Sequence, residues 1–363
     1  MMLRVTVPCL LAMLTTIPAG LAQEIDWHDV TTWDIEGRIL PDQERSRWFD
    51  RFPASAEGKV TSNVWNLSRH SAGMMVRFRT DATEIHVDYK LLSGRLAMAH
   101  MPATGVSGID LYARDSKDKW RWVQVTRPAG QEVKVALVKG LAPGSREYAA
   151  YLPLYNGVER LSIGVPSGSA FEKLTPRDEK PIVFYGTSIT HGACASRPGM
   201  VHTAILGRRF DRPVVNLGFS GNGRMDLSVG EYLIQLDAAA YVIDCLPNMN
   251  AQMVSQKCVP LVQQIRKARP DTPIILVEDR RNTNSWILPS RDAHHTANHK
   301  ALQIAFQQLT KEKIKHLYYI AGDHLYGDDG DGATDGSHAS DLGFARQADA
   351  FFPVLTKALN ATN

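Results

Sequence analysis

Four short segments in the second half of the chain carry the residue types that acyl transfer requires. Ser188 supplies a hydroxyl, Asn248 a side-chain amide, and Gly221 lies in a glycine-rich loop, "GFSGNG". Asp335 and His338 place a carboxylate three residues before an imidazole. Acyl transfer needs a nucleophile, a base that removes its proton, an acid that orients the base, and donors for the oxyanion. Together the segments indicate a serine hydrolase.

Each of these residues also has a structural explanation when it is considered alone. Ser188 and Asn248 belong to the residue types that cap helix N-termini, and glycine-rich loops commonly serve turns with positive φ. An Asp-x-x-His sequence can equally begin a capped, solvated helix. The catalytic interpretation gains weight from order, because three segments follow three successive predicted strands and the fourth precedes the last predicted helix.

The elements that would position these residues are apolar strands alternating with amphipathic helices. The expected strands are "PIVFYG" from residue 181, "PVVNLG" from 213, "AAYVID" from 239, "PIILVED" from 273 and "HLYYIAG" from 316. Nearly continuous β-branched and aromatic strands separated by helices predict a parallel sheet that is covered on both faces. Functional groups of such sheets lie at the carboxyl ends of the strands, where Ser188, Gly221 and Asn248 follow the first three.

The first half of the chain has a different period. Between residues 23 and 175, apolar residues alternate with polar ones in short runs such as "MVRFR" and "IHVDY". Alternation predicts half-buried antiparallel strands, and many short strands at regular intervals indicate a β-sandwich of jelly-roll type. Residues 166–181 lose this period and carry prolines at both ends. We therefore expect a β-sandwich domain over residues 23–175 and an α/β domain over residues 176–363.

The composition is that of a soluble globular protein, and the N-terminus is that of an exported one. The 363 residues are 44% hydrophobic, and the formal net charge is only +3, which argues against a nucleic-acid partner. Residues 1–22 combine Arg4, an apolar run and small residues ending at Ala22. This pattern predicts a signal peptide rather than a membrane anchor. We expect a secreted or periplasmic protein with no membrane attachment after cleavage.

Three of the four cysteines, Cys194, Cys245 and Cys258, would remain in the exported chain. An oxidising compartment permits one disulfide among them. Cys194 follows the segment with Ser188 and Cys245 follows a predicted buried strand, so they could pair. Three buried, unpaired thiols are an equally good interpretation of the same residues.

At the four catalytic segments the sequence resembles the SGNH or GDSL hydrolases, a family of serine esterases built on a flavodoxin-like sheet. "YGTSIT" with Ser188, "NLGFSGNG" with Gly221, "CLPN" with Asn248 and "DGSH" resemble its four conserved blocks, in order, over about residues 180–360. Residues 108–112, "GIDLY", resemble the GxDLY stretch of a subgroup with an N-terminal β-domain. The resemblance implies a three-layer α/β/α domain preceded by the β-sandwich.

Two positions depart from the family's pattern. The first block has Thr187 where the family usually has Asp, and the third reads Leu-Pro-Asn-Met where Gly-x-Asn-Asp is usual. Neither change removes a catalytic atom. The second leaves the geometry around Asn248 open.

The resemblance implies a serine esterase mechanism without metal or organic cofactor. His338 would take the Ser188 proton while Asp335 holds the imidazole, and the N–H groups of Ser188 and Gly221 with the Asn248 amide would bind the oxyanion. The implied substrate is an acyl ester, typically an acetyl group on a saccharide or small molecule. An acyltransferase, a lipase or a thioesterase could use the same residues, and a non-catalytic carbohydrate-binding protein is the alternative of another class.

Other charged residues suggest binding roles. Arg197, Arg280 and Arg281 could hold an anionic group of the substrate, with structural salt bridges as the alternative. His295 and His299 have a spacing that can hold zinc on a helix, but no Glu follows the first of them. We therefore expect these two histidines on a solvated helix face or a pocket rim, and no metal site.

Overall fold

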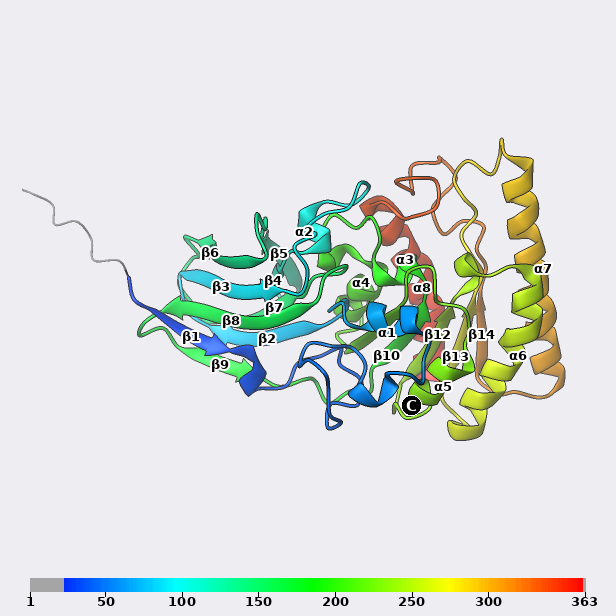
Figure 1. Cartoon of the computed structure of the whole chain (residues 1–363), viewed down its shortest axis with the longest axis horizontal. Helices are drawn as coiled ribbons and strands as arrows, with labels where there is room; N and C mark the ends of the chain where they lie inside the picture. Colours follow the sequence, from blue (N-terminus) through cyan, green and yellow to red (C-terminus); the bar gives the residue numbers. More distant parts are fainter. Residues whose placement is uncertain (1–22, 362–363) are drawn as a thin grey trace, which may run out of the picture.

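The computed structural model describes residues 23–361, so the predicted signal peptide lies outside the described residues. A β-rich lobe formed by the first half of the chain lies beside an α/β lobe formed by the second half (Figure 1). Within residues 23–361 no helix has both the length and the hydropathy of a membrane-spanning segment.

The β-rich lobe consists of two antiparallel sheets. One is four-stranded, in the order β1-β8-β3-β6, and the other is five-stranded, in the order β5-β4-β7-β2-β9. The strands are β1 (Ile25–Asp29), β2 (Met75–Thr80), β3 (Glu84–Leu91), β4 (Asp110–Arg114), β5 (Trp120–Val125), β6 (Glu132–Lys139), β7 (Arg146–Tyr151), β8 (Val158–Pro166) and β9 (Phe171–Leu174).

The alternating pattern of the sequence produces the core between these two sheets. In β3 every second side chain is buried, as period-two alternation requires. Val87 of β3 and Phe78 of β2 belong to one apolar cluster that joins residues of both sheets. The predicted β-sandwich is therefore confirmed.

Short helices interrupt the β-rich half: η1 (Val30–Thr32), η2 (Ala54–Ala56), α1 (Ser62–Ser68) and α2 (Ala103–Val106). The segment that contains η2 and α1 does not pack inside the sandwich. Phe52, Val64 and Trp65 of this segment share an apolar cluster with Phe219 and Tyr232 of the α/β lobe. The two lobes are thus joined by a layer of N-terminal residues that lies against the α/β sheet.

The α/β lobe has a five-stranded parallel sheet in the order β11-β10-β12-β13-β14. Its strands are β10 (Ile182–Gly186), β11 (Val214–Gly218), β12 (Ala240–Asp244), β13 (Ile274–Val277) and β14 (Leu317–Ile320). Its helices are α3 (Ser188–His191), η3 (Pro198–Met200), α4 (His202–Arg209), α5 (Leu227–Leu233), η4 (Leu246–Asn248), α6 (Ala251–Ala268), α7 (Pro289–Lys311) and α8 (Asp341–Asn360).

Helices cover both faces of this sheet, as its buried strands require. Residues of α5, α6 and α7 pack on one face with Tyr185 and Ile243, and residues of α4 and α8 pack on the other with Phe184 and Val242. This strand order is flavodoxin-like, and it confirms the predicted three-layer α/β/α fold. The order reverses beside β10, so the loop after β10 lies at the switch point where such sheets bind ligands.

Candidate active site

The nucleophile candidate follows directly from the end of β10. Ser188 is the first residue of α3 and is 7% exposed. The side chain of Thr187 accepts a hydrogen bond from the Ile189 N–H at 3.3 Å, so Thr187 is the N-cap of the helix. The capping explanation of Ser188 is therefore wrong, and the hydroxyl of Ser188 is left for another partner. The Thr in place of the family's Asp performs the capping.

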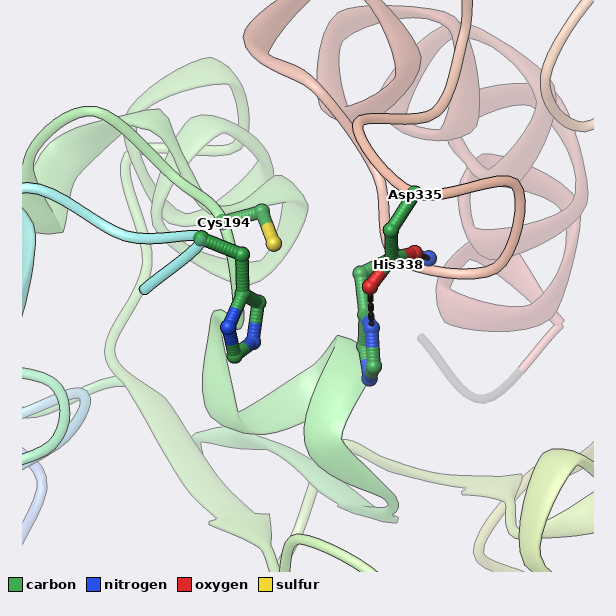
Figure 2. A group of neighbouring side chains, drawn as sticks. Cys194, Asp335 and His338 are labelled. Carbon is green, nitrogen blue, oxygen red and sulfur yellow. Dashed lines mark hydrogen bonds and ion pairs between the residues drawn. The ribbon is translucent and has the colours of Figure 1, made fainter. Parts of the chain in front are cut away.

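Ser188, His338 and Asp335 form one chain of hydrogen bonds. His338 Nε2 lies 2.8 Å from Ser188 Oγ, and His338 Nδ1 lies 2.7 Å from Asp335 Oδ2 (Figure 2). The two ring nitrogens therefore face the hydroxyl and the carboxylate respectively. Removal of the Ser188 proton by Nε2 would leave an imidazolium next to a carboxylate, which stabilises that charge.

The loop before α8 holds the carboxylate and the imidazole in place. Asp335 Oδ1 accepts hydrogen bonds from the N–H of Ser337 at 3.0 Å and of His338 at 2.8 Å. Although partial burial acts in the opposite direction, these bonds and the His338 side chain lower the pKa of Asp335 to about 2. Asp335 is therefore ionised at neutral pH. The Tyr326 hydroxyl also donates to the Ser337 carbonyl, at 2.7 Å.

The three candidate oxyanion donors lie in the segments that directly follow β10, β11 and β12. Gly221 has φ of +70°, a conformation that favours glycine. The Asn248 Oδ1 accepts from the Gly223 N–H at 3.3 Å, so the amide nitrogen is the part of Asn248 that can donate elsewhere. The loop after β11 is tied to β10 by a bond from Phe219 N–H to the Gly186 carbonyl, at 2.9 Å. The unusual Leu-Pro-Asn-Met sequence thus leaves the Asn248 amide nitrogen outside this hydrogen bond.

The three arginines predicted to bind substrate are held in ion pairs. Arg280 has a side chain with 0% exposure, and it bonds the Asp244 carboxylate and, at 2.7 Å, Gln347. The salt-bridge alternative therefore describes the contacts of Arg280, because the buried Asp244 carboxylate requires a cation. A substrate contact of Arg280 stays a prediction.

Arg197 and Arg281 are likewise paired, so the salt-bridge alternative describes their observed contacts. Arg197 bonds Asp110 at 3.2 Å and lies over the Trp122 ring. Arg281 contacts Asp323 at 2.7 Å and Asp292 at 2.8 Å.

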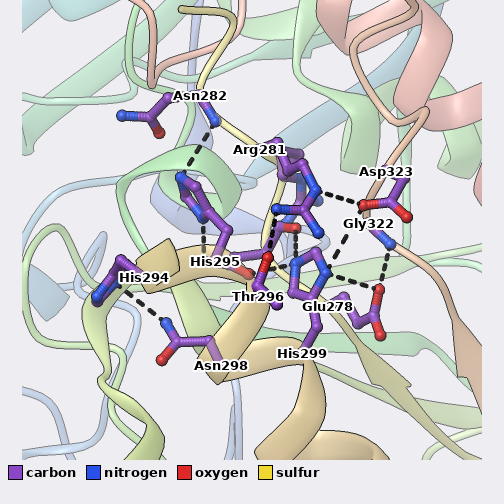
Figure 3. A network of polar contacts seen from close by, with 12 residues as sticks. Glu278, Arg281, Asn282, His294, His295, Thr296, Asn298, His299, Gly322 and Asp323 are labelled. Carbon is purple, nitrogen blue, oxygen red and sulfur yellow. Dashed lines mark hydrogen bonds and ion pairs between the residues drawn. The ribbon is translucent and has the colours of Figure 1, made fainter. Parts of the chain in front are cut away.

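His295 and His299 are buried, so they do not lie on a solvated helix face, but His295 lines a pocket together with Ile189 and Ser337, as the pocket-rim alternative expected. His295 Nδ1 and His299 Nε2 each lie 2.7 Å from the Asp279 carboxylate, inside the polar network shown in Figure 3. Although burial acts in the opposite direction, these histidines lower the pKa of Asp279 to about 2. The Asp279 and Glu278 carboxylates in turn raise the pKa of His299, against the effect of its burial. Carboxylates at the end of β13 therefore explain why the histidines point inward.

Cys194 and Cys245 are not bonded to each other; with Cys258 they are free and buried. Cys245 packs in the apolar layer with Cys258, whereas Cys194 lies near Asp335. The disulfide hypothesis is wrong, because the two thiols face different surroundings. Burial, and then the Asp335 carboxylate, raises the pKa of the Cys194 thiol to about 12. This thiol is therefore protonated at neutral pH.

Two residues of the β-rich half reach the candidate triad, and the sequence analysis did not identify them. The Tyr155 hydroxyl donates to the Ser188 carbonyl at 3.3 Å, and the His100 ring centroid lies 5.7 Å from that of His338. Neither belongs to a periodic pattern or a motif that marks a site. Only the packing of the two lobes brings them here.

Two hollows lie next to the loop that carries Asp335 and His338. A pocket of about 240 Å³ includes Ile189 and Ser337, the sequence neighbours of Ser188 and His338, in its lining. A larger one, of about 560 Å³, is lined by Trp286 and by Asp323 among others. The loop with Trp286 touches the catalytic loop, because the Thr283 N–H donates to the Gly336 carbonyl at 2.9 Å.

Comparisons with known proteins agree with this fold and site. Residues 179–356 match the model of the GDSL-like lipase/acylhydrolase family, and residues 25–171 match the model of the N-terminus of SGNH hydrolase-type esterases. A crystal structure of a GDSL-like lipase from Bacteroides ovatus is 30% identical, with a TM-score of 0.87, and the match covers 93% of this chain and 98% of that one.

More distant structures share the fold. The salicylyl-acyltransferase SsfX3 from a tetracycline biosynthetic pathway is 18% identical, with a TM-score of 0.71 over 94% of this chain and 96% of that one. A family two carbohydrate esterase from Clostridium thermocellum, solved with cellohexaose, is 15% identical, with a TM-score of 0.56 over 79% and 92%. A search of curated proteins found no match.

The chain belongs to the GDSL-like lipase/acylhydrolase family, which confirms the resemblance seen in its sequence. It is a carboxylic ester hydrolase of the SGNH type. Within that class, its first half is the GxDLY domain that precedes the hydrolase domain of such esterases.

Proposed function

We propose that the chain is an exported serine esterase that removes an acyl group, acetyl above all, from a carbohydrate ester. The observation that carries this proposal is the hydrogen-bonded chain from Ser188 Oγ to His338 Nε2, at 2.8 Å, and from His338 Nδ1 to Asp335 Oδ2, at 2.7 Å. A hydroxyl, an imidazole and an ionised carboxylate in this order constitute the machinery of covalent acyl transfer.

The reaction proceeds in two halves. Ser188 Oγ attacks the ester carbonyl carbon as His338 Nε2 takes its proton, and the collapsing intermediate releases the sugar alcohol, which receives that proton. Water then attacks the acyl-enzyme with His338 again as base, and the acid leaves as Ser188 regains its proton. The N–H groups of Ser188 and Gly221 and the Asn248 amide stabilise the oxyanion in both halves, with each well-placed donor contributing about 3 kcal/mol.

Two observations support a short acyl group on a saccharide. The pocket beside Ile189 and Ser337 holds only about 240 Å³ and is lined largely by polar or charged residues, including Asn282, Arg291 and His294, which disfavours a long alkyl chain. The fold is shared with carbohydrate esterases, one of them solved with cellohexaose. Because fold alone does not dictate substrate, the substrate class needs a direct test.

The nucleophile is tested by labelling the mature chain with a fluorophosphonate and comparing Ser188→Ala with Ser255→Ala, a matched change on α6. Wild type and Ser255→Ala should be labelled, and Ser188→Ala should lose the label and at least about a thousandfold of kcat. Full turnover by Ser188→Ala contradicts the assignment. An unlabelled and inactive wild type would instead favour a non-catalytic carbohydrate-binding protein.

The substrate class is tested with p-nitrophenyl esters of increasing chain length and with acetylated oligosaccharides. A steep fall in kcat/KM beyond acetyl supports the deacetylase, whereas a rise with chain length supports a lipase. Transfer of the acetyl group to an added alcohol in preference to water would identify an acyltransferase, the activity of the SsfX3 relative.

Export is tested by expressing the full chain with its first 22 residues and sequencing the N-terminus of the protein recovered outside the cytoplasm. Cleavage after Ala22 is the expected result, because small residues precede that position. An intact N-terminus on membrane-bound protein would contradict it.

A further inference from the structure

Four side chains that could bind a metal ion lie close together at the candidate triad. His100, Cys194, Asp335 and His338 each offer one ligand atom, and these atoms lie within 4.8 Å of one another. Figure 2 shows the Cys194 sulfur directed toward the pair formed by Asp335 and His338. The serine esterase mechanism uses neither Cys194 nor His100.

The polypeptide holds His100 and Cys194 together from two different lobes. His100 lies in a tight turn that is closed by two backbone hydrogen bonds between Met98 and Met101, at 3.0 and 3.1 Å. Just after this turn, Thr104 Oγ1 donates to the Ser196 carbonyl at 2.6 Å, which ties the segment to the loop that carries Cys194. Contacts between the two lobes therefore keep the His100 imidazole near the Cys194 thiol.

The mixture of donors selects the kind of metal. Zinc is bound by thiolate, imidazole and carboxylate in four-coordinate tetrahedral sites, and this cluster offers one sulfur, two imidazoles and one carboxylate. Calcium and magnesium take oxygen ligands almost exclusively. The donor set thus fits zinc and not the hard divalent cations.

We propose that His100, Cys194, Asp335 and His338 form a zinc-binding site whose occupation inhibits the esterase. The inhibition rests on the proposed function of the triad. His338 Nδ1 bonds Asp335 and His338 Nε2 bonds Ser188, so whichever ring nitrogen binds the metal, one hydrogen bond of the triad is broken. Binding releases the Cys194 thiol proton to solvent and leaves the base unable to activate the nucleophile.

Binding is tested first, without reference to activity. Cobalt(II) is added to the mature chain under reducing conditions, and the thiolate-to-cobalt charge-transfer band in the near ultraviolet is recorded. Wild type and the control Cys258→Ser should show the band, and Cys194→Ser should not. Absence of the band in wild type overturns the proposal.

Inhibition is tested with zinc and p-nitrophenyl acetate. Zinc should inhibit wild type and Cys258→Ser, and a chelator should restore activity. Cys194→Ser and His100→Ala should remain active without metal but need at least about tenfold more zinc for half-inhibition, since even loss of a ligand's supporting partner weakens metal binding that much. Unchanged zinc sensitivity in both variants overturns the proposal.

The two proposals fail in distinguishable ways. If Ser188→Ala keeps full turnover while the cobalt band persists, the triad assignment is wrong and the metal site stands. If the fluorophosphonate label is lost in Ser188→Ala but wild type shows no cobalt band, the triad stands and the metal site is wrong.

Discussion

The hydroxyl of Tyr155, in the β-rich half of the chain, donates a hydrogen bond to the backbone carbonyl of Ser188 at 3.3 Å. The Tyr155 ring also stacks on His191 of α3, with centroids 4.2 Å apart. The N-terminal lobe therefore contacts the short helix that carries the proposed nucleophile, and it contributes to the architecture of the candidate active site.

Tyr155→Phe should lower the free energy of unfolding by about 1 kcal/mol, because it removes one hydrogen bond and keeps the stacked ring. Since the lost bond ends at Ser188, kcat should fall several-fold with KM nearly unchanged. Denaturant unfolding and steady-state kinetics measure the two effects. Trp122→Phe, which removes the hydrogen bond from Trp122 Nε1 to Asp110 in the same lobe, is the control. An unaltered kcat would show that α3 needs no support from Tyr155.

Asn248→Ala should reduce kcat by about 10²- to 10³-fold with little change in KM, because an oxyanion donor acts mainly in the transition state. Asn250→Ala, at the nearby N-cap of α6, is the matched control and should affect stability more than turnover. A change confined to KM would mean that Asn248 binds substrate instead.

Asp335→Asn should lower kcat by roughly 10⁴-fold, because the neutral amide neither fixes the imidazole tautomer nor stabilises its cation. The pKa of Asp335 is lowered to about 2, so its ionised form stabilises the fold above the pKa of the unfolded chain, about 4. This contribution should disappear as pH falls from about 4 to about 2. Unfolding measured against pH should show the stability difference between wild type and Asp335→Asn shrinking over that window.

Arg51→Met should lower the free energy of unfolding by about 3 kcal/mol or more, because it leaves buried carbonyl oxygens without a donor. The buried Arg51 guanidinium donates to the carbonyls of Asn216 at 2.8 Å and Gly218 at 2.9 Å, at the end of β11. It also donates to Leu67 at 2.6 Å and His70 at 3.0 Å. Arg121→Met, on the exposed side of β5, should change the free energy of unfolding little. An equal loss of stability in both variants would contradict the role of the Arg51 hydrogen bonds.

Trp286→Ala should raise KM for acetylated oligosaccharides about fivefold and leave p-nitrophenyl acetate turnover unchanged. The Trp286 side chain is 83% exposed and lines the larger hollow beside the catalytic loop, and loss of aromatic stacking costs about 1 kcal/mol. Leu227→Ala, an exposed apolar residue of α5, controls for a general surface effect. Equal KM values for the oligosaccharide would exclude Trp286 from the saccharide site.

The sequence by itself determined the strands of the α/β sheet, the alternating sandwich before it, and the proximity of Asp335 and His338. These signals are local: burial on both faces makes a strand continuously apolar, alternation marks one buried face, and three residues separate the carboxylate from the imidazole. The meeting of Ser188, Gly221 and Asn248 at one edge of the sheet was also predictable, because parallel strands end at the same edge.

The tertiary structure alone decided which charged and sulfur-containing residues face the site. Arg280 forms an ion pair with the buried Asp244. His295 and His299 point inward to Asp279. Cys194 is not bonded to Cys245. Each outcome depends on a partner distant in the chain and on the cost of burying a charge without one. No spacing within the sequence records such a pairing, just as none records that Tyr155 reaches Ser188.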